Sequence, residues 1–452
     1  METVLEKFSR VSWILSIPLL VLPFIEPASL TKVLPVLFCI LGIEILCAIC
    51  SWCIIRENWP CFVASTWLFT CALAAFMEDS SIWTRSFSKE YFPYFLWLML
   101  LGYTGLRAGM HFSVFPSKLR ALPEEAAKLC SPEKICPRNY TRVIQLICLI
   151  SSLAVLSFYL YYNCFPSFTD KPALYRYAYF NGPNANSLVR FAFRTFSAIS
   201  VVSLLFMVVF LKKREGRHNL LLSCPIVLLA LFCSFASGSR GDISMMVLFI
   251  LIMIIFSLAG WKRFFVSLAL FSLFAALFCF FSYYRTKYSI RLLTLFPEAF
   301  DASILLEAFH KKEVPWAMGK TYLAAFLSFI PSAIFPFREA YGFGRYSLEI
   351  LFSGNAAPTY GGLRPSFVGE AYLNFGVPGV FFLGYLLGAV LGLWQKGTAS
   401  LRNSSGAMVF FFLFSLLTVM VSDFYGIFHA FVLIALLMWA MRRIMERFGH
   451  EA

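Results

Sequence analysis

Long apolar stretches, separated by short charged or polar segments, dominate the chain. Most of them are about 20 residues long, the length that an α-helix needs to cross the hydrocarbon core of a bilayer. Backbone groups in lipid must be paired within their own segment, so runs of this length predict helices rather than barrel strands. The pattern predicts twelve spans, at residues 11–26, 32–55, 61–78, 91–109, 143–163, 192–211, 219–238, 243–260, 264–283, 372–394, 407–421 and 424–441.

Composition supports the same interpretation. Hydrophobic residues make up 60% of the 452 positions and charged residues only 14%, whereas a typical soluble chain is about 25% charged. The sequence therefore predicts an all-α, polytopic integral membrane protein, with a single membrane domain over residues 1–452.

The distribution of basic residues predicts how the helices are oriented. With the N-terminus in the cytoplasm, 21 of the 38 Lys and Arg residues fall on the inner segments and 8 on the short outer segments. Short cytoplasmic loops carry the excess of basic residues, while loops longer than about 60 residues do not count in this comparison. Both termini are therefore expected in the cytoplasm. Basic loops of this kind explain the net charge of +14, and no nucleic-acid partner is expected.

Two enlarged segments lie on the outer side in this topology, at residues 164–191 and 284–371. Within the longer one, residues 322–337 are apolar but interrupted by Pro331 and Pro336. A stretch too short and too broken to span a bilayer indicates a re-entrant or interfacial helix. We expect such a helix near 322–337 rather than a thirteenth span.

The turn Gly238-Ser239-Arg240-Gly241-Asp242 joins two predicted spans at the outer surface. Glycines permit a tight turn, and Asp242 is placed to cap the helix that follows. Arg240 beside a helix N-terminus, with its free N–H groups and positive dipole end, would form an anion site suited to a diphosphate. The alternative is an ordinary turn whose arginine extends to lipid phosphates.

A glycine-rich segment from Gly361 to Gly379 leads into the span at 372–394 and carries a second candidate site. Glu370 and Asn374 are four residues apart and so share one helical face. A carboxylate withdrawn from water at the mouth of a span has a raised pKa and can act as a general base. The alternative is a structural glutamate paired with a neighbouring arginine, Arg364.

The long outer segment mixes basic residues, His310 and aromatic side chains. Arginines with aromatics suit a ligand that has phosphates and sugar rings, although an interfacial belt of Trp, Tyr and Arg has the same composition. His310 is a candidate base or a residue of a solvated helix face. We expect its geometry to be less fixed than that of Glu370, because it lies within a long loop.

Several chemistries have no motif in this sequence. It contains no nucleotide P-loop, no Gly-Xaa-Ser-Xaa-Gly nucleophile elbow and no His-Glu-Xaa-Xaa-His zinc motif. The loop cysteines Cys130 and Cys136 lack metal-ligand spacing. We therefore predict a reaction without a cofactor or a metal.

The chain resembles the O-antigen polymerase family, the Wzy-type oligosaccharide repeat-unit polymerases of bacterial inner membranes. The resemblance rests on the hydropathy plan, the two enlarged outer loops and Gly-Ser-Arg-Gly-Asp at 238–242. It rests also on Pro-Ser-Phe-Val-Gly-Glu-Ala-Tyr-Leu-Asn-Phe-Gly at 365–376, followed by Pro378-Gly379.

This resemblance implies a membrane glycosyltransferase whose active site faces the periplasm. It would move a growing glycan from undecaprenyl diphosphate to a sugar hydroxyl of the next lipid-linked repeat unit, among membrane lipids and with a chain-length regulator protein as a partner. Glu370, Arg240 and His310 would be catalytic, with Arg240 on the leaving diphosphate and Glu370 taking the acceptor proton. The implied substrate-binding residues are Arg364, Arg285, Arg291, Asn374, Tyr372 and Asp242.

Two alternatives stay open from the sequence. An O-antigen ligase would pass the glycan to lipid A core, but its Arg-(three residues)-Leu and His-(ten residues)-Gly patterns are not met, since Ser289 follows Arg285 and Thr321 follows His310 at those spacings. A flippase or transporter of lipid-linked sugars would need an acidic residue deep in the membrane, and Glu44 is the one clear candidate.

Overall fold

The computed structural model describes six longer stretches of the chain and several short pieces. The stretches are 91–112, 137–161, 217–236, 297–327, 341–352 and 365–398, and the pieces are 192–193, 195–197, 199–200, 203–204, 262, 265–266, 269–270, 272–273, 276, 330 and 363. The chain divides into two compact units, which are described separately. Unit 1 is Met1–Glu125, Arg291–Ser400 and Leu413–Ala430, and unit 2 is Ala126–Ile290, Leu401–Phe412 and Phe431–Ala452.

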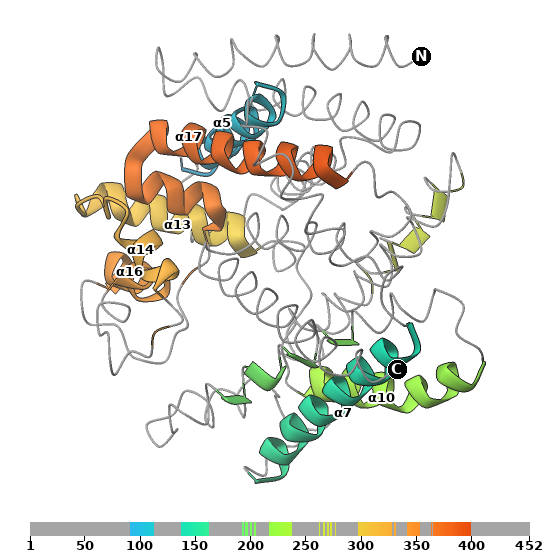
Figure 1. Ribbon diagram of the computed structural model, residues 1–452. Helices are drawn as coiled ribbons and strands as arrows, with labels where there is room; N and C mark the ends of the chain where they lie inside the picture. Colours follow the sequence, from blue (N-terminus) through green and yellow to red (C-terminus); the bar gives the residue numbers. More distant parts are fainter. Residues whose placement is uncertain are drawn as a thin grey trace. The chain divides into compact units, whose positions relative to one another are not determined.

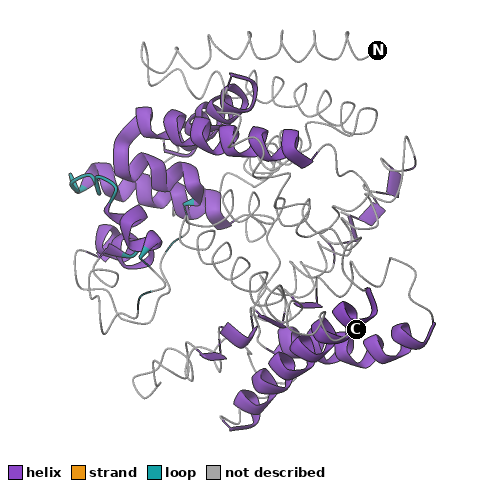
Figure 2. Cartoon of the chain, in the orientation of Figure 1, coloured by secondary structure: helices purple, strands orange, loops and turns teal. Residues whose placement is uncertain are grey.

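Every regular element of the described residues is a helix (Figure 2), so the all-α prediction is confirmed for this part of the chain. Unit 1 holds α5 (Tyr91–Phe112), α13 (Pro297–Lys311), α14 (Lys320–Phe326), α16 (Phe343–Phe352) and α17 (Ser366–Thr398) (Figure 1). Unit 2 holds α7 (Pro137–Tyr161) and α10 (Arg217–Ala236).

Four of these helices coincide with predicted spans: α5 with 91–109, α7 with 143–163, α10 with 219–238 and α17 with 372–394. The predicted spans 192–211 and 264–283 are described only as short helical pieces, and the other six lie outside the described residues. Among the residues described, one stretch, Ser366–Leu393, is long and apolar enough to cross a membrane, with a mean hydropathy of 1.9.

Helices α5 and α17 pack with their backbones in direct contact, because glycines line both sides of the interface. A Cβ atom at Gly388 would overlap the carbonyl oxygen of Leu106 and lie 2.6 Å from its carbonyl carbon, and one at Gly109 would lie 2.7 Å from the backbone nitrogen of Ala389. Close approach through small residues is the usual way in which helices associate within membranes.

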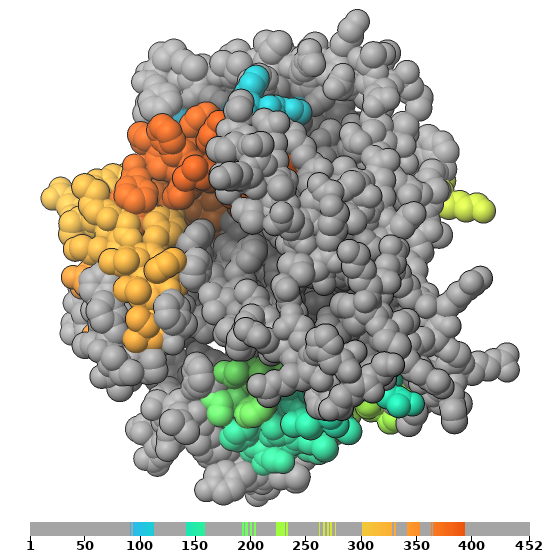
Figure 3. Space-filling model, viewed as in Figure 1, coloured from blue at the N-terminus to red at the C-terminus, as the bar shows by residue number. Residues whose placement is uncertain are grey.

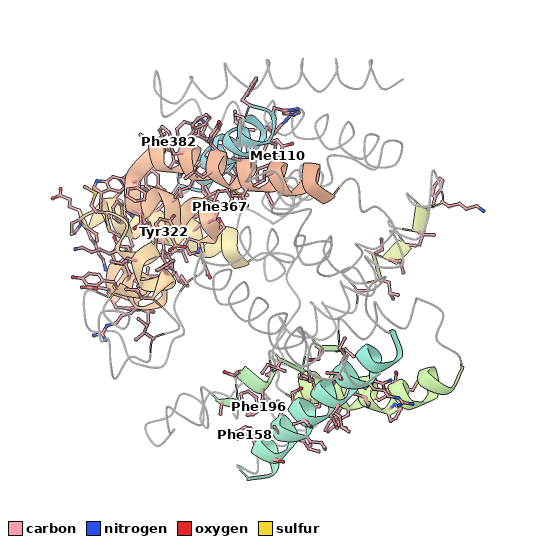
Figure 4. The ribbon with its side chains drawn as sticks, in the orientation of Figure 1. Met110, Phe158, Phe196, Tyr322, Phe367 and Phe382 are labelled. Atoms are coloured by element: carbon pink, nitrogen blue, oxygen red, sulfur yellow. The ribbon has the colours of Figure 1, made fainter. Side chains whose placement is uncertain are left out.

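The second half of α17 also presents large apolar side chains away from the protein interior. Phe382, Leu386 and Val390 follow one another at four-residue spacing and are between 50% and 65% exposed. Figure 4 labels Phe382 on α17 and Met110 at the end of α5. A helix with glycines against its neighbour and a row of exposed apolar side chains suits a lipid-facing position.

Helix α17 is broken at Gly376, and Figure 1 shows its two segments running in different directions. Gly376 has φ 67° and ψ −160°, which is accessible to glycine but strained for other residues. Pro378 follows and has no N–H to continue the helical ladder. The first segment, 366–375, therefore ends in carbonyl groups that need donors from elsewhere.

Helices α13, α14 and α16 belong to the segment that we predicted as the long outer loop. Helix α13 packs against α5, α16 and α17, and α14 packs against α16. On the face seen in Figure 3, atoms of this segment lie beside those of α17. The expected interfacial helix at 322–337 is described over Lys320–Phe326, where it ends before Pro331, and residues 331–340 lie outside the described part.

A seam of small polar side chains joins the helices of unit 2. Gln145 Nε2 of α7 donates to Ser223 Oγ of α10 at 2.6 Å, and the hydroxyls of Ser152 and Ser200 lie 2.7 Å apart. Around this seam Phe158 contacts Phe196, as Figure 4 shows. Polar side chains bonded between apolar helices give these contacts a defined register.

Candidate functional site

The first segment of α17 carries the residues that the sequence singled out most strongly. Its helix begins at Ser366 after Pro365, as expected for proline at a helix start. Glu370 and Asn374 lie one turn apart and are both fully buried, each 0% exposed. Tyr372 is on the same segment and only 3% exposed.

Glu370 is held by a hydroxyl group from α14. Thr321 Oγ1 donates to Glu370 Oε1 at 2.8 Å, and Asn374 Nδ2 donates to Thr321 Oγ1 at 2.7 Å and to the carbonyl oxygen of Glu370 at 2.8 Å. Thr321 therefore connects the two residues that the sequence placed on one face. The pKa of Tyr322 is raised well above 10 by burial and by the nearby Glu370 carboxylate.

The loop between α13 and α14 covers the break in α17. We name residues 312–319 the strap. The N–H groups of Ala317 and Met318 donate to the carbonyls of Leu373 and Asn374 at 3.0 and 3.2 Å, and Gly319 N–H donates to Asn374 Oδ1 at 2.9 Å. The strap thus supplies the donors that the break at Gly376 removes.

A second group of polar contacts surrounds His310, which is on α13. The hydroxyl of Tyr372 lies 2.9 Å from His310 Nε2, and Tyr94 of α5 donates to the Tyr372 hydroxyl at 3.2 Å. The Tyr372 hydroxyl can then donate a hydrogen bond to Nε2 of a neutral imidazole. Partial burial lowers the pKa of His310 below its ordinary value of 6.5, so the imidazole is neutral at pH 7.

Aromatic rings enclose this chain of hydroxyls. His310 stacks on Tyr91 with ring centroids 5.6 Å apart, and Trp316 contacts Phe309 at 4.9 Å and Tyr372 at 5.4 Å. His310 is only partly covered by these rings and keeps a surface exposed to solvent, and Trp316 is 39% exposed. Rings with apolar faces and polar edges at a surface suit a ligand that has both kinds of group, such as a sugar.

The structure therefore places four of the predicted site residues on two neighbouring groups of contacts: His310 of α13 bonds to Tyr372 of α17, and Glu370 and Asn374 of α17 are linked through Thr321. Tyr372 lies two residues from Glu370 and from Asn374, so the two groups lie on different faces of the helix. The expectation that His310 has loosely fixed geometry is wrong, because a helix and two tyrosines hold it. The other five predicted residues lie outside the described part of the chain: Arg240, Asp242, Arg285, Arg291 and Arg364.

Two residues of this site were not identified as site residues from the sequence. Thr321 carries no motif, and its role depends on the fold of the strap. Tyr94 could have been suspected only as an aromatic residue at the start of a span, a position that interfacial belts also favour. Among the residues described, no group of three or more His, Cys, Asp or Glu side chains could hold a metal ion.

No protein-family model, curated protein or solved structure matches this chain.

Proposed function

We propose that the chain is a polytopic inner-membrane glycosyltransferase, an O-antigen polymerase of the Wzy type that joins undecaprenyl-diphosphate-linked repeat units on the periplasmic face. The single observation that carries the proposal is the cluster at the beginning of α17. Two segments were singled out from the sequence, one around His310 and one around Glu370. They meet at the N-terminal end of α17, the described helix that is long and apolar enough to cross a membrane.

The packing of α17 supports a membrane location. The apolar run of its second segment, residues 377–394, rises roughly 27 Å at 1.5 Å per residue, close to the thickness of a hydrocarbon core. Its glycines contact α5 and its exposed face carries Phe382, Leu386 and Val390. Irregular backbone at a helix break is tolerated in membranes where it is buried in protein or lines a cavity, and half-helices of this kind often build binding sites.

The proposed reaction is a displacement at the anomeric carbon of the growing glycan. A sugar hydroxyl of the incoming repeat unit attacks that carbon, the bond from the carbon to the diphosphate oxygen breaks, and the lipid diphosphate leaves. Glu370 takes the proton of the attacking hydroxyl. The role of binding the departing diphosphate is given to Arg240 from the sequence alone, because a bidentate guanidinium suits that group.

In this proposal the exposed rings of His310 and Trp316 contact the sugars, and the Tyr372 hydroxyl holds His310 in place. One of the arginines Arg364, Arg285 or Arg291 supplies positive charge for the second lipid diphosphate. The reaction draws its driving force from the diphosphate leaving group, so neither a nucleotide sugar nor a metal ion takes part.

Deletion of the gene tests the proposal against its alternatives. A polymerase predicts surface glycans of one repeat unit attached to lipid A core. Unmodified core with accumulated lipid-linked polymer would indicate a ligase, and loss of all exported glycan would indicate a flippase. Either of these two results would contradict the proposal.

A further inference from the structure

The strap is bound tightly to α17 although its backbone is strained. Glu313 and Met318 have φ 49°, the left-handed region that side chains other than glycine rarely adopt, and Gly319 has φ 82°. Two strained non-glycine residues in an eight-residue segment persist only when surrounding contacts impose them, and such strain concentrates at clamps and switches. The strap is held by hydrogen bonds to α13, through Val314 N–H on Phe309, to α16, through the Tyr346 hydroxyl on Pro315, and to α17.

Five hydrogen bonds connect the strap and the first turn of α14 to α17. In three of them a backbone N–H group of the strap is the donor: Ala317 and Met318 donate to the carbonyls of Leu373 and Asn374, and Gly319 donates to Asn374 Oδ1. The remaining two run through Thr321, which donates to Glu370 and accepts from Asn374. Ala317, in the middle of the strap, is only 5% exposed, so the strap is seated and not merely adjacent.

Thr321 occupies the position that a substrate would need. A general base must lie within about 2.6–3.2 Å of the hydroxyl whose proton it accepts. Thr321 Oγ1 lies 2.8 Å from Glu370 Oε1 and donates to it. Glu370 is 0% exposed, so a hydroxyl from solution reaches its carboxylate only after a neighbouring group, such as Thr321, moves away.

We infer that the strap is a gate over Glu370 and that the Thr321 hydroxyl holds the place of the acceptor sugar hydroxyl. Binding of a lipid-linked glycan at the exposed rings of His310 and Trp316 lifts the strap. The acceptor hydroxyl then replaces that of Thr321 on the carboxylate. The identity of the ligand rests on the proposed function, whereas the latching of the strap by Thr321 does not.

Cysteine labelling measures the latch without any enzymatic assay. Ala317→Cys is introduced, and the rate at which the new thiol reacts with a maleimide is measured in purified protein in detergent. The chain without this substitution gives the background labelling of the 13 native cysteines. Thr321→Val keeps the side-chain shape but removes the hydroxyl. It should raise labelling at position 317 about tenfold, the scale expected when a hydrogen bond to a charged group is lost.

Two control variants separate the latch from a general loss of packing. Thr321→Ser keeps the hydroxyl and should leave labelling within about twofold of the wild-type rate. Thr104 is another buried threonine, whose hydroxyl bonds to Leu100 within α5, so Thr104→Val should also leave position 317 protected. Unchanged labelling in Thr321→Val, or equal labelling in Thr104→Val, would overturn the latch.

Glu370→Gln distinguishes failure of the gate from failure of the proposed function. Its amide oxygen still accepts from Thr321 through a weaker, uncharged bond, so labelling at position 317 should rise clearly less than in Thr321→Val while polymerisation is lost. Normal polymer from Glu370→Gln would remove the proposed base and leave the latch intact. Labelling in Glu370→Gln as fast as in Thr321→Val would contradict a latch in which the Thr321 hydroxyl bonds to residue 370.

The last experiment tests which molecule displaces the Thr321 hydroxyl from Glu370. The probe is the undecaprenyl-diphosphate-linked single repeat unit extracted from cells that lack the gene, compared with undecaprenyl phosphate. The glycan-bearing lipid should raise labelling at position 317 at least about threefold, and the bare lipid should not, because only a sugar hydroxyl can replace Thr321. Equal labelling with both lipids, or no response to either, would overturn the gate.

Discussion

The glycine interface between α5 and α17 allows a graded prediction, since the same Gly→Ala change meets different neighbours along one seam. At Gly388 a Cβ would overlap the Leu106 carbonyl oxygen and lie 2.6 Å from its carbonyl carbon. At Gly392 its nearest neighbour would be the Met110 carbonyl oxygen at 2.9 Å. At Gly102 its nearest neighbour would be a side-chain methyl, Val368 Cγ2, at 3.1 Å.

Two terms decide the sign at each position. Alanine favours a helix over glycine by about 1 kcal/mol, while overpacking costs about 1–3 kcal/mol. At Gly388 the neighbours are backbone atoms that cannot rotate away, and the overlap with the Leu106 carbonyl oxygen is relieved only if the helices separate by more than about 1 Å. Gly388→Ala should therefore lower the free energy of unfolding by about 1–2 kcal/mol. Gly392→Ala should be nearly neutral, and Gly102→Ala neutral or stabilising.

Thermal unfolding of the three variants in detergent, followed by tryptophan fluorescence, measures this order. Leu386→Ala is the matched control on the exposed face of the same helix, 57% exposed, and should change the unfolding midpoint little. A Gly388→Ala protein as stable as Gly102→Ala would show that the two backbones are not in contact, and the reasoning would be refuted.

Three further predictions concern the site. Because the pKa of His310 lies below 6.5 in the folded protein, the unfolded chain takes up a proton first as the pH falls. Stability should therefore decrease as the pH falls below about 6.5. His310→Gln removes the titrating imidazole and should make the unfolding midpoint depend less on pH over about pH 5–8. Gly376→Ala should cost about 1–3 kcal/mol through its backbone conformation alone, since φ 67° with ψ −160° is a region almost restricted to glycine and the nearest neighbour, Trp316, leaves 3.5 Å of room; no change in unfolding midpoint would contradict the break. Arg240→Ala should abolish polymer on glycan gels while the protein still inserts, and Arg240→Lys should restore it only partly; normal long chains from Arg240→Ala would exclude the diphosphate role.

Hydropathy was sufficient to locate the helices that the structure describes in the predicted spans. Apolar runs such as 91–109 and 219–238 coincide with α5 and α10. The length of an apolar run can be read directly from the sequence, and a run of about 20 residues is the length of a bilayer-spanning helix. The helix break was not predicted. Gly376 and Pro378 were visible in the sequence, but only the N–H groups of a distant strap make a break there stable.

For the candidate site too, contacts within one helix could be predicted from the sequence, whereas contacts between distant segments could not. Glu370 and Asn374 were paired by their spacing, which is a property of one helix. Their link through Thr321, and the approach of His310 to Tyr372, join residues about 50–60 positions apart and depend on how α13 and α14 pack against α17. Periodicity within a segment carries no information on such contacts.

Reconstitution tests the central claim most directly. The purified protein is placed in lipid vesicles with undecaprenyl-diphosphate-linked single repeat units as the only glycan, without nucleotide sugar and with a chelator of divalent metals. The account predicts a ladder of longer lipid-linked glycans, absent in the Glu370→Gln protein. Repeat units that stay single with the wild-type protein, while it remains folded by its unfolding midpoint, would contradict the assignment as a polymerase.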